Sequence, residues 1–248
     1  MRTPTSSSAP IASSSPSRTR LGRLIRDINR KISGDPARAE RFAPLRALAV
    51  KVRFQNQRQR GPKVYSLHAP EVECIGKGKA RAPYEFGCKV SIAVPVTQPK
   101  GGQFVLHAKA LHDNPFDGYT LKGAVADVES NTGVEVRRIH VDKGYRGHDY
   151  PNRFRVFISG QISGQVRPTT AAIKREMKRR AAVEPVIGHL KADHRMDRNY
   201  LKGQDGDRSN AILAAAGFNF HLLLRWLAAL LRAIFLAALQ SLVSPQPA

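Results

Sequence analysis

Residues 134–148 read VEVRRIHVDKGYRGH, a strand-forming run followed by an acidic residue and a glycine-rich turn. The β-branched residues between Val136 and Val141 predict a strand. Asp142 follows at the carboxyl end of that strand, the edge where α/β sheets collect ligand-binding residues. This run therefore predicts a core element and a candidate site residue together.

A helix and an earlier strand precede this run. Apolar residues at helical spacing predict the helix, with Thr120 as its N-cap and Gly133 as its stop. Alternating residues from Phe104 to Leu111 predict the strand before it. Because strand, helix and strand in this order form a crossover unit, part of the sheet should be parallel.

Further strands and a long helix surround the crossover unit. Strands are expected at 63–66, 84–94 and 154–158. A basic helix should open at Thr169 or Thr170 and run past Glu184, with Pro185 kinking it or starting a new segment. Strands followed by helices indicate an α/β fold in which helices flank a mixed sheet.

The amino-terminal part is expected to be an extension of this domain. Apolar residues at helical spacing from Leu21 to Ile32 predict a helix that stops at Ser33 and Gly34. A basic stretch follows up to Lys63 and should be helical from 38 to 50. Residues 1–17 are rich in Ser and Pro and lack an apolar stretch, so we expect disorder there rather than a secretory signal. Their acid-poor composition also suits an organelle transit peptide, although no helical pattern precedes Leu21.

The tail from Asn210 to Leu242 is strongly apolar. A membrane span would explain this composition, but Arg225 and Arg232 interrupt every apolar stretch of roughly 18 residues. Packing against the core or against another subunit is the favoured interpretation. We therefore expect four segments: a disordered start (1–17), a basic helical lead-in (18–62), an α/β domain (63–205) and an apolar helix with its tail (206–248).

The charge balance indicates a polyanionic partner. The 248 residues contain 41 Lys and Arg against 19 Asp and Glu, which gives a formal net charge of +22. Such a field favours nucleic acid, although charge alone fits ribosomal, chromatin-like and nucleic-acid-processing proteins equally. Cys74 and Cys88 show no metal-ligand pattern and predict thiols in a reducing compartment rather than a disulfide framework.

Two acidic residues stand in positions suited to metal-dependent chemistry on DNA. Phosphoryl transfer on DNA commonly uses two divalent metals held by carboxylates from separate elements. Asp142 ends a strand, and Glu184 shares one helix face with Arg180 and Lys191. In isolation, Asp142 would be a turn residue and the trio an ordinary ion-paired face. As a site, the trio would place a metal ligand between two phosphate contacts.

Several strings of residues together resemble a known family. The run VDKGYRG (141–147), with Arg180, Glu184 and Lys191 at their spacing, is similar to the DDE transposases of bacterial insertion sequences, close to the insertion-sequence five family. Further matching strings are YSLHAPEVECI (65–75), YEFG (84–87), NPFDG (114–118), EPVIGHLK (184–191) and NYLKG (199–203). The resemblance extends over residues 19–231.

This resemblance implies an RNase H-like fold, an Asp-Asp-Glu triad, dependence on Mg²⁺ (or Mn²⁺), and cleavage and joining at the ends of a mobile element. By motif, Asp142 corresponds to the second Asp and Glu184 to the Glu, both catalytic metal ligands. Arg180 and Lys191 occupy the Arg and Lys of the family's Tyr-Arg-Glu-Lys signature and are expected to bind DNA. The Tyr position of that signature holds Met177.

The family's first Asp has no counterpart in this chain. In the family it lies on a strand upstream of the region that matches residues 19–51, which predicts an N-terminally truncated transposase with a sheet incomplete at its N-terminal side. Glu85, Asp113 and Asp117 are acidic, but the family pattern assigns none of them this role. We expect DNA binding without Mg²⁺-dependent cleavage. The alternative is a non-catalytic DNA-binding remnant or a domesticated transposase.

The remaining polar residues give weaker signals. Lys77 and Lys79 lie in a basic loop that is expected to contact DNA phosphate or to be simply solvated. The histidines at 68, 107, 112, 140 and 148 show no metal-ligand spacing and favour surface or core roles. A structural protein of ribosomal RNA would explain the charge but none of the strings. We expect DNA and a second copy of the chain as partners, no membrane, and a bacterial cytoplasmic location at the nucleoid.

Overall fold

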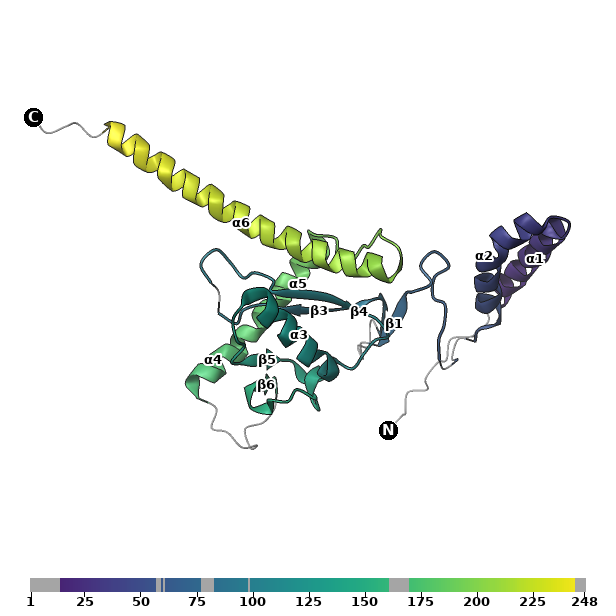
Figure 1. Ribbon diagram of the computed structural model, residues 1–248, viewed down its shortest axis with the longest axis horizontal. Coiled ribbons are helices and arrows are strands. Elements are labelled where there is room, and N and C mark those ends of the chain that lie inside the picture. The colour runs from purple at the N-terminus through teal and green to yellow at the C-terminus, as the bar shows by residue number, and fades with distance from the viewer. Residues whose placement is uncertain are drawn as a thin grey trace, which may run out of the picture. The chain divides into compact units, whose positions relative to one another are not determined.

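The computed structural model describes residues 14–56, 59, 61–76, 83–97, 99–160 and 170–243. The chain divides into two compact units, Met1–Cys74 and Ile75–Ala248 (Figure 1). The first unit is helical, and the second contains the strands and the remaining helices.

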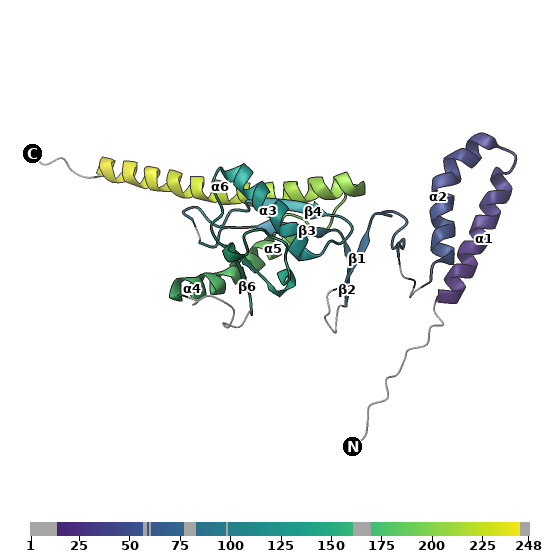
Figure 2. The ribbon, with the colours of Figure 1, turned by 60° about the horizontal axis from the view of Figure 1, so that its bottom comes forward.

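Two helices, α1 (Ser14–Ile32) and α2 (Pro36–Phe54), lie side by side in the first unit (Figure 2). The predicted helix that stops at Ser33 is confirmed, and Ile25 and Ile32 are its buried apolar residues. Asp35 caps α2 by accepting a hydrogen bond from the Arg38 backbone N–H at 3.0 Å. The two helices therefore form a hairpin joined by a short turn.

The start of α1 differs from the expectation. We predicted disorder for residues 1–17, but α1 begins at Ser14; residues 1–13 lie outside the described residues. Pro16 does not prevent this, because the N–H groups of a helix's first turn have no intrahelical acceptor to lose.

The predicted strand at 63–66 is wrong. The structure has irregular backbone there, and a side chain provides the hydrogen bonds that a neighbouring strand would make. The Gln55 amide donates to the Val64 carbonyl at 2.8 Å, and its oxygen accepts from the Val64 N–H at 3.0 Å. This pairing satisfies both backbone groups of buried Val64 without a sheet.

The long strand predicted over 84–94 is divided in two. The strand β1 (Glu73–Gly76), which straddles the unit boundary, pairs with β2 (Tyr84–Gly87), and β3 (Lys89–Ala93) pairs with β4 (His107–Leu111). Gly87 has a φ of 145°, a backbone conformation that interrupts the strand and that glycine adopts without steric cost. The strands β3 and β4 are antiparallel, with Lys89 opposite Leu111 and Ala93 opposite His107.

The helix α3 (Asp117–Thr132) leads to β5 (Ile139–Val141). Its stop at Gly133, with φ 66°, is confirmed, but its start is three residues earlier than the predicted cap at Thr120. The Thr120 hydroxyl instead donates to the Asp117 carbonyl at 2.7 Å within the first turn. The strand β5 ends at Val141 as expected, so Asp142 follows it directly.

Parallel pairing is present but in a different place. The strand β5 pairs in parallel with β6 (Val156–Ile158), whereas β4, the earlier strand of the predicted crossover unit, pairs only with β3 among the described residues. We expected one mixed sheet, but the described residues form three sheets of two strands each. The RNase H-like arrangement is therefore not confirmed, although the mixture of helices and small sheets is consistent with an α/β fold.

Two apolar clusters hold the second unit together. In one, Leu121 and Val125 of α3 pack against Val141 and Ile158 of the β5–β6 pair. The other lies between the β3–β4 pair, with the segment just before β4, and two helices, α5 (Val183–Ala192) and α6 (Gly203–Val243). Its buried members are Val105, Val186, Leu190, Ala214, Ala215 and Phe218.

The helix α6 is partly packed and partly exposed. Buried residues from Ala211 to Phe218 attach its first half to the rest of the second unit, whereas the large apolar residues from Leu223 to Leu239 are exposed. Both ribbon views show its later turns running past the strands of this unit (Figures 1 and 2). By length and composition alone, α6 is the one described helix that is apolar enough to cross a membrane.

Candidate active site

Asp142 is positioned by the end of β5. The chain turns there into a short 3₁₀ helix, η2 (Lys143–Tyr145), and Asp142 is its N-cap. Its Oδ1 accepts a hydrogen bond from the Gly144 N–H at 2.9 Å, so the carboxylate has a defined orientation. The residue is exposed, which leaves this oxygen-rich group accessible from solvent.

A second carboxylate lies beside Asp142. A Cβ atom placed on Gly144 would stand 2.7 Å from Asp117 Oδ2 and 3.1 Å from Asp142 Oδ1, so both carboxylates border the same glycine. Asp117 comes from the first turn of α3, which packs against η2. Its Oδ1 lies 2.9 Å from the Lys89 Nζ, and that ammonium group also donates to the Pro115 carbonyl at 2.8 Å. Asp117 therefore carries its own counter-ion.

The phenol of Tyr145 is a third ionisable group near the carboxylates of Asp117 and Asp142. Burial is the main cause that raises the pKa of Tyr145, and the negative charges of Asp117 and Asp142 raise it further. A hydrogen bond with the Thr120 side chain works in the opposite direction. Because the pKa is raised, the phenol stays protonated at neutral pH and is a hydrogen-bond donor rather than an anion.

Glu184 and Arg180 lie together on the helical segment that follows. The predicted helix is confirmed as α4 (Ala171–Arg179), capped by Thr170, but it is interrupted by the 3₁₀ turn η4 (Arg180–Ala182) before α5 begins. Glu184 Oε1 lies 3.7 Å from Arg180 Nη2, and the Glu184 side chain is 69% exposed. This long contact at an exposed carboxylate contributes little stability, and the Arg180 side chain itself is only 22% exposed.

The other predicted site residues are less engaged or lie elsewhere. Lys191 is exposed in the last turn of α5. Lys77 and Lys79 lie outside the described residues. Asp142 and Glu184 come from different elements. The Asp142 carboxylate contacts Gly144 and lies beside Asp117, whereas the Glu184 carboxylate contacts Arg180. None of these contacts joins the two carboxylates.

A histidine in β5 ties α4 to the strand that delivers Asp142. His140 Nε2 lies 2.9 Å from Glu176 Oε2, and His140 Nδ1 lies 3.2 Å from the sulfur of Met177. Burial lowers the pKa of His140 more than the neighbouring Glu176 raises it, so the ring is neutral at pH 7. Arg138 also pairs with Glu176, at 2.8 Å. Met177, at the signature's Tyr position, thus packs on His140.

Each of the two predicted carboxylates is a ligand of the kind that a hard divalent cation prefers. Asp142 and Glu184 offer exposed carboxylate oxygens, which are the ligands that Mg²⁺ and Mn²⁺ prefer. Asp117, Lys89 and Tyr145 were not identified as site residues from the sequence. Asp117 appears there as a turn residue of the NPFDG string, and nothing in the sequence indicates that α3 brings it beside Asp142.

One of the comparisons with known proteins found a related protein family. Residues 146–224 match a family model described as Transposase DDE domain. The matched segment contains Arg180, Glu184 and Lys191 and begins four residues after Asp142. Comparison with curated proteins and with solved structures found no match. The family match supports a DDE transposase, a class that acts on DNA and generally uses divalent metal ions.

Proposed function

We propose that this chain is the catalytic domain of a transposase of the insertion-sequence five family, which cleaves and joins DNA at the ends of a mobile element. The observation that carries the proposal is the family match over residues 146–224, which includes the segment with Arg180, Glu184 and Lys191. The position of Asp142 at the end of a parallel strand supports it, because such an edge gathers metal-binding carboxylates.

In this proposal Asp142 and Glu184 hold Mg²⁺, or Mn²⁺ in its place. The metal would stabilise the negative charge that develops on the phosphate during strand cleavage. Arg180 and Lys191 bind the DNA backbone on either side of Glu184, as their positions one turn before and two turns after it on the same segment allow. The contact of Arg180 with Glu184 is long, at 3.7 Å, which supports exchange for a phosphate, and its side chain, 22% exposed, would extend further toward the DNA.

The finer fold proposal is an incomplete RNase H-like sheet. The antiparallel β3–β4 pair and the parallel β5–β6 pair are the two kinds of pairing that such a mixed sheet contains. Among the described residues, each strand of these two pairs has one paired neighbour only. In this proposal a further strand with the family's first Asp would supply the third carboxylate of the triad.

We propose that these 248 residues alone bind DNA without cleaving it. Asp117 is the nearest acidic side chain identified beside Asp142, but the Lys89 ammonium at 2.9 Å neutralises it and competes with a metal ion. Two carboxylates bind a divalent ion weakly, and in-line displacement assisted by two metals needs a bridging ligand. A non-catalytic DNA-binding remnant is the second form of this proposal.

Two measurements on the purified chain test the proposal. Fluorescence anisotropy with duplex DNA should show binding that weakens steeply as salt rises, and supercoiled plasmid should remain uncut with Mg²⁺ or Mn²⁺. Cleavage that is lost in Asp142→Asn and retained in the nearby control Asp149→Asn would overturn the inactivity and support catalysis. The Asn variant keeps the oxygen that caps η2 and removes only the charge. Absence of DNA binding would contradict both forms of the proposal.

The DNA contacts are tested by single charge removals. Arg180→Gln and Lys191→Gln should each lower the slope of log K against log salt by about 1, because each would lose about one phosphate contact. Lys122→Gln, a substitution of an exposed lysine on α3, is the matched control and should leave the slope unchanged. Equal losses in all three variants would indicate a diffuse charge effect instead of a defined site.

Self-association through α6 is part of the same proposal. Its exposed apolar residues from Leu223 to Leu239 support a second copy of the chain as the partner, in the bacterial cytoplasm at the nucleoid. Sedimentation at increasing concentration should show a reversible rise in mass. Recovery of the protein only with detergent or lipid vesicles would contradict this and favour a membrane-associated α6.

A further inference from the structure

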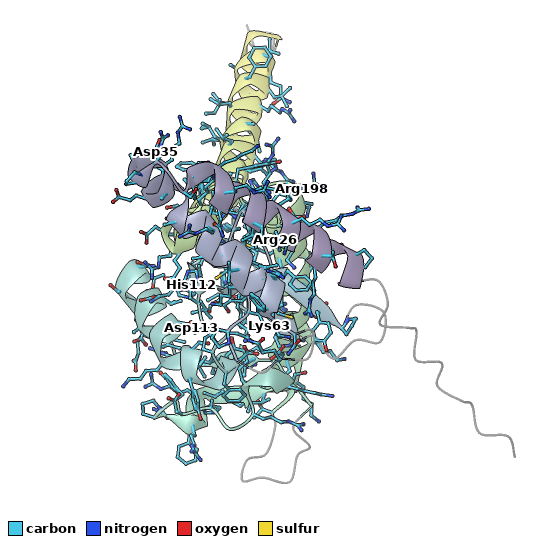
Figure 3. All side chains as sticks on the ribbon, turned by 90° about the vertical axis from the view of Figure 1, so that its right-hand side faces the viewer. Arg26, Asp35, Lys63, His112, Asp113 and Arg198 are labelled. Atoms are coloured by element: carbon cyan, nitrogen blue, oxygen red, sulfur yellow. The ribbon has the colours of Figure 1, made fainter. Side chains whose placement is uncertain are left out.

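Three side chains from separate parts of the second unit meet at the end of the β3–β4 pair. Because Lys89 lies opposite Leu111, Cys88 and His112 face each other at the next position of the ladder. Asp207 reaches the same place from the first turns of α6, which packs against β4. One ligand atom from each residue lies within 4.8 Å of the other two, and all three residues are half-buried. Figure 3 labels His112.

The spacing of the first two atoms is that of metal ligands. Cys88 Sγ lies 3.6 Å from His112 Nδ1. In a tetrahedral zinc site, with Zn–S of about 2.3 Å and Zn–N of about 2.0 Å, these atoms are separated by about 3.5 Å. Because the three ligand atoms lie within 4.8 Å of one another, the Asp207 oxygen would need to move by roughly 1.5 Å at most to complete such a face.

The surroundings orient Asp207 toward this position. The Asn199 amide donates to Asp207 Oδ1 at 2.8 Å, a contact of the kind that holds a metal-binding carboxylate in place. Gly206 allows the preceding turn to pack closely, since a Cβ there would stand 2.7 Å from the Leu201 backbone. The Cys88 thiol contacts the Leu111 carbonyl at 3.3 Å, so metal binding would replace its proton and release it to solvent.

We propose that Cys88, His112 and Asp207 bind a divalent zinc-type cation. A thiolate, an imidazole and a carboxylate form a ligand set for Zn²⁺ or Co²⁺ and not for Mg²⁺, which requires oxygen ligands. The ion would join the β3–β4 pair to the start of α6 and stabilise the second unit. This site has no residue in common with the carboxylates proposed for Mg²⁺, and its existence does not depend on the proposed activity on DNA.

Cobalt is a direct probe, because Co²⁺ bound by a thiolate absorbs light through charge transfer from sulfur. Titration of the full-length, reduced chain should show this absorption with one Co²⁺ per chain, and Zn²⁺ should abolish it by displacement. Cys88→Ser should lose the absorption, whereas Cys74→Ser, a change at the other cysteine, should retain it. Asn199→Ala should weaken Co²⁺ binding by about 10- to 100-fold, because it removes the support of Asp207 and no ligand.

The wild-type titration decides the question even if a variant fails to fold. Absence of the charge-transfer absorption in the folded wild-type chain would overturn the proposal, as would its persistence in Cys88→Ser or its loss in Cys74→Ser alone. Zn²⁺ should also raise the Tm of the wild-type chain and leave that of Cys88→Ser unchanged, since binding to the folded state alone stabilises it. An equal rise in both would likewise overturn the proposal.

Discussion

Replacement of Leu190 by Ala should remove a large part of the stability of the second unit. Leu190 is fully buried on α5, the helix that begins with the Glu184 segment, and it packs with Val105, Val186 and Phe218. The change deletes three carbon atoms, worth about 2.4 kcal/mol in lost burial at about 0.8 kcal/mol each. The neighbouring Ala214 and Ala215 cannot extend into the space, so a cavity penalty brings the expected loss to about 3–5 kcal/mol.

Urea unfolding followed by tryptophan fluorescence measures this loss. The single tryptophan, Trp226, lies on α6 in the same unit beside Gly101 and is 53% exposed, so a small change in its emission reports the loss of this contact on unfolding. Leu213→Ala is the matched control: it makes the same substitution in a helix at a side chain that is 64% exposed. It should change the unfolding free energy by no more than about 0.5 kcal/mol.

Two results would refute the reasoning about Leu190. A loss below about 1 kcal/mol with an unchanged m-value would mean that Leu190 is not enclosed in a packed core. Equal losses for Leu190→Ala and Leu213→Ala would mean that the two positions are equally buried in solution. That result would also favour burial of the exposed face of α6 against a second copy.

Two further predictions concern Gly144, which borders the Asp117 and Asp142 carboxylates, and the pH dependence of the unfolding free energy. Gly144→Ala places a Cβ 2.7 Å from Asp117 Oδ2, so a carboxylate at this exposed position must shift, and we expect a loss of up to about 1 kcal/mol in urea unfolding. Gly123→Ala on α3, where a Cβ meets nothing within 4 Å, should be neutral or stabilising, and a comparable loss there would contradict the steric explanation. Because burial lowers the folded-state pKa of His140 below 6.5, the unfolded chain takes up the proton first. Stability should therefore fall as pH drops below about 6.5, and His140→Gln should make that fall shallower by at most about 1.4 kcal/mol per pH unit. An unchanged slope in urea titrations of this variant between pH 7 and 5 would contradict the assignment.

Local sequence patterns predicted several elements correctly. The apolar spacing from Leu21 to Ile32, the stop at Gly133 and the strand end before Asp142 all agree with the structure. These features depend on side chains and backbone conformations within a few residues, which a sequence displays directly. The division of the strand at Gly87 was missed, because the alternation of side chains on its two sides continues past the positive φ.

Such local patterns do not predict which distant segments pair with each other. The sequence indicated parallel strands, but not that β5 pairs with β6 while β4 pairs with β3. It also showed no partner for Val64, whose backbone is satisfied by the Gln55 side chain. Backbone N–H and C=O groups can form hydrogen bonds with many different segments of the chain. Only the packing of the whole unit selects which segment becomes the partner.

The sequence by itself determined the resemblance to DDE transposases, the basic character of the chain, and the positions of Asp142 and Glu184 on their elements. Tertiary structure alone decided which side chains from distant parts of the chain lie next to one another. The packing of α3 against η2 brings Asp117 to Asp142, and the start of α6 brings Asp207 to Cys88 and His112. The physical reason is that coordination and ion pairing depend on distances of a few ångströms between residues far apart in the chain, which their spacing in the sequence does not encode.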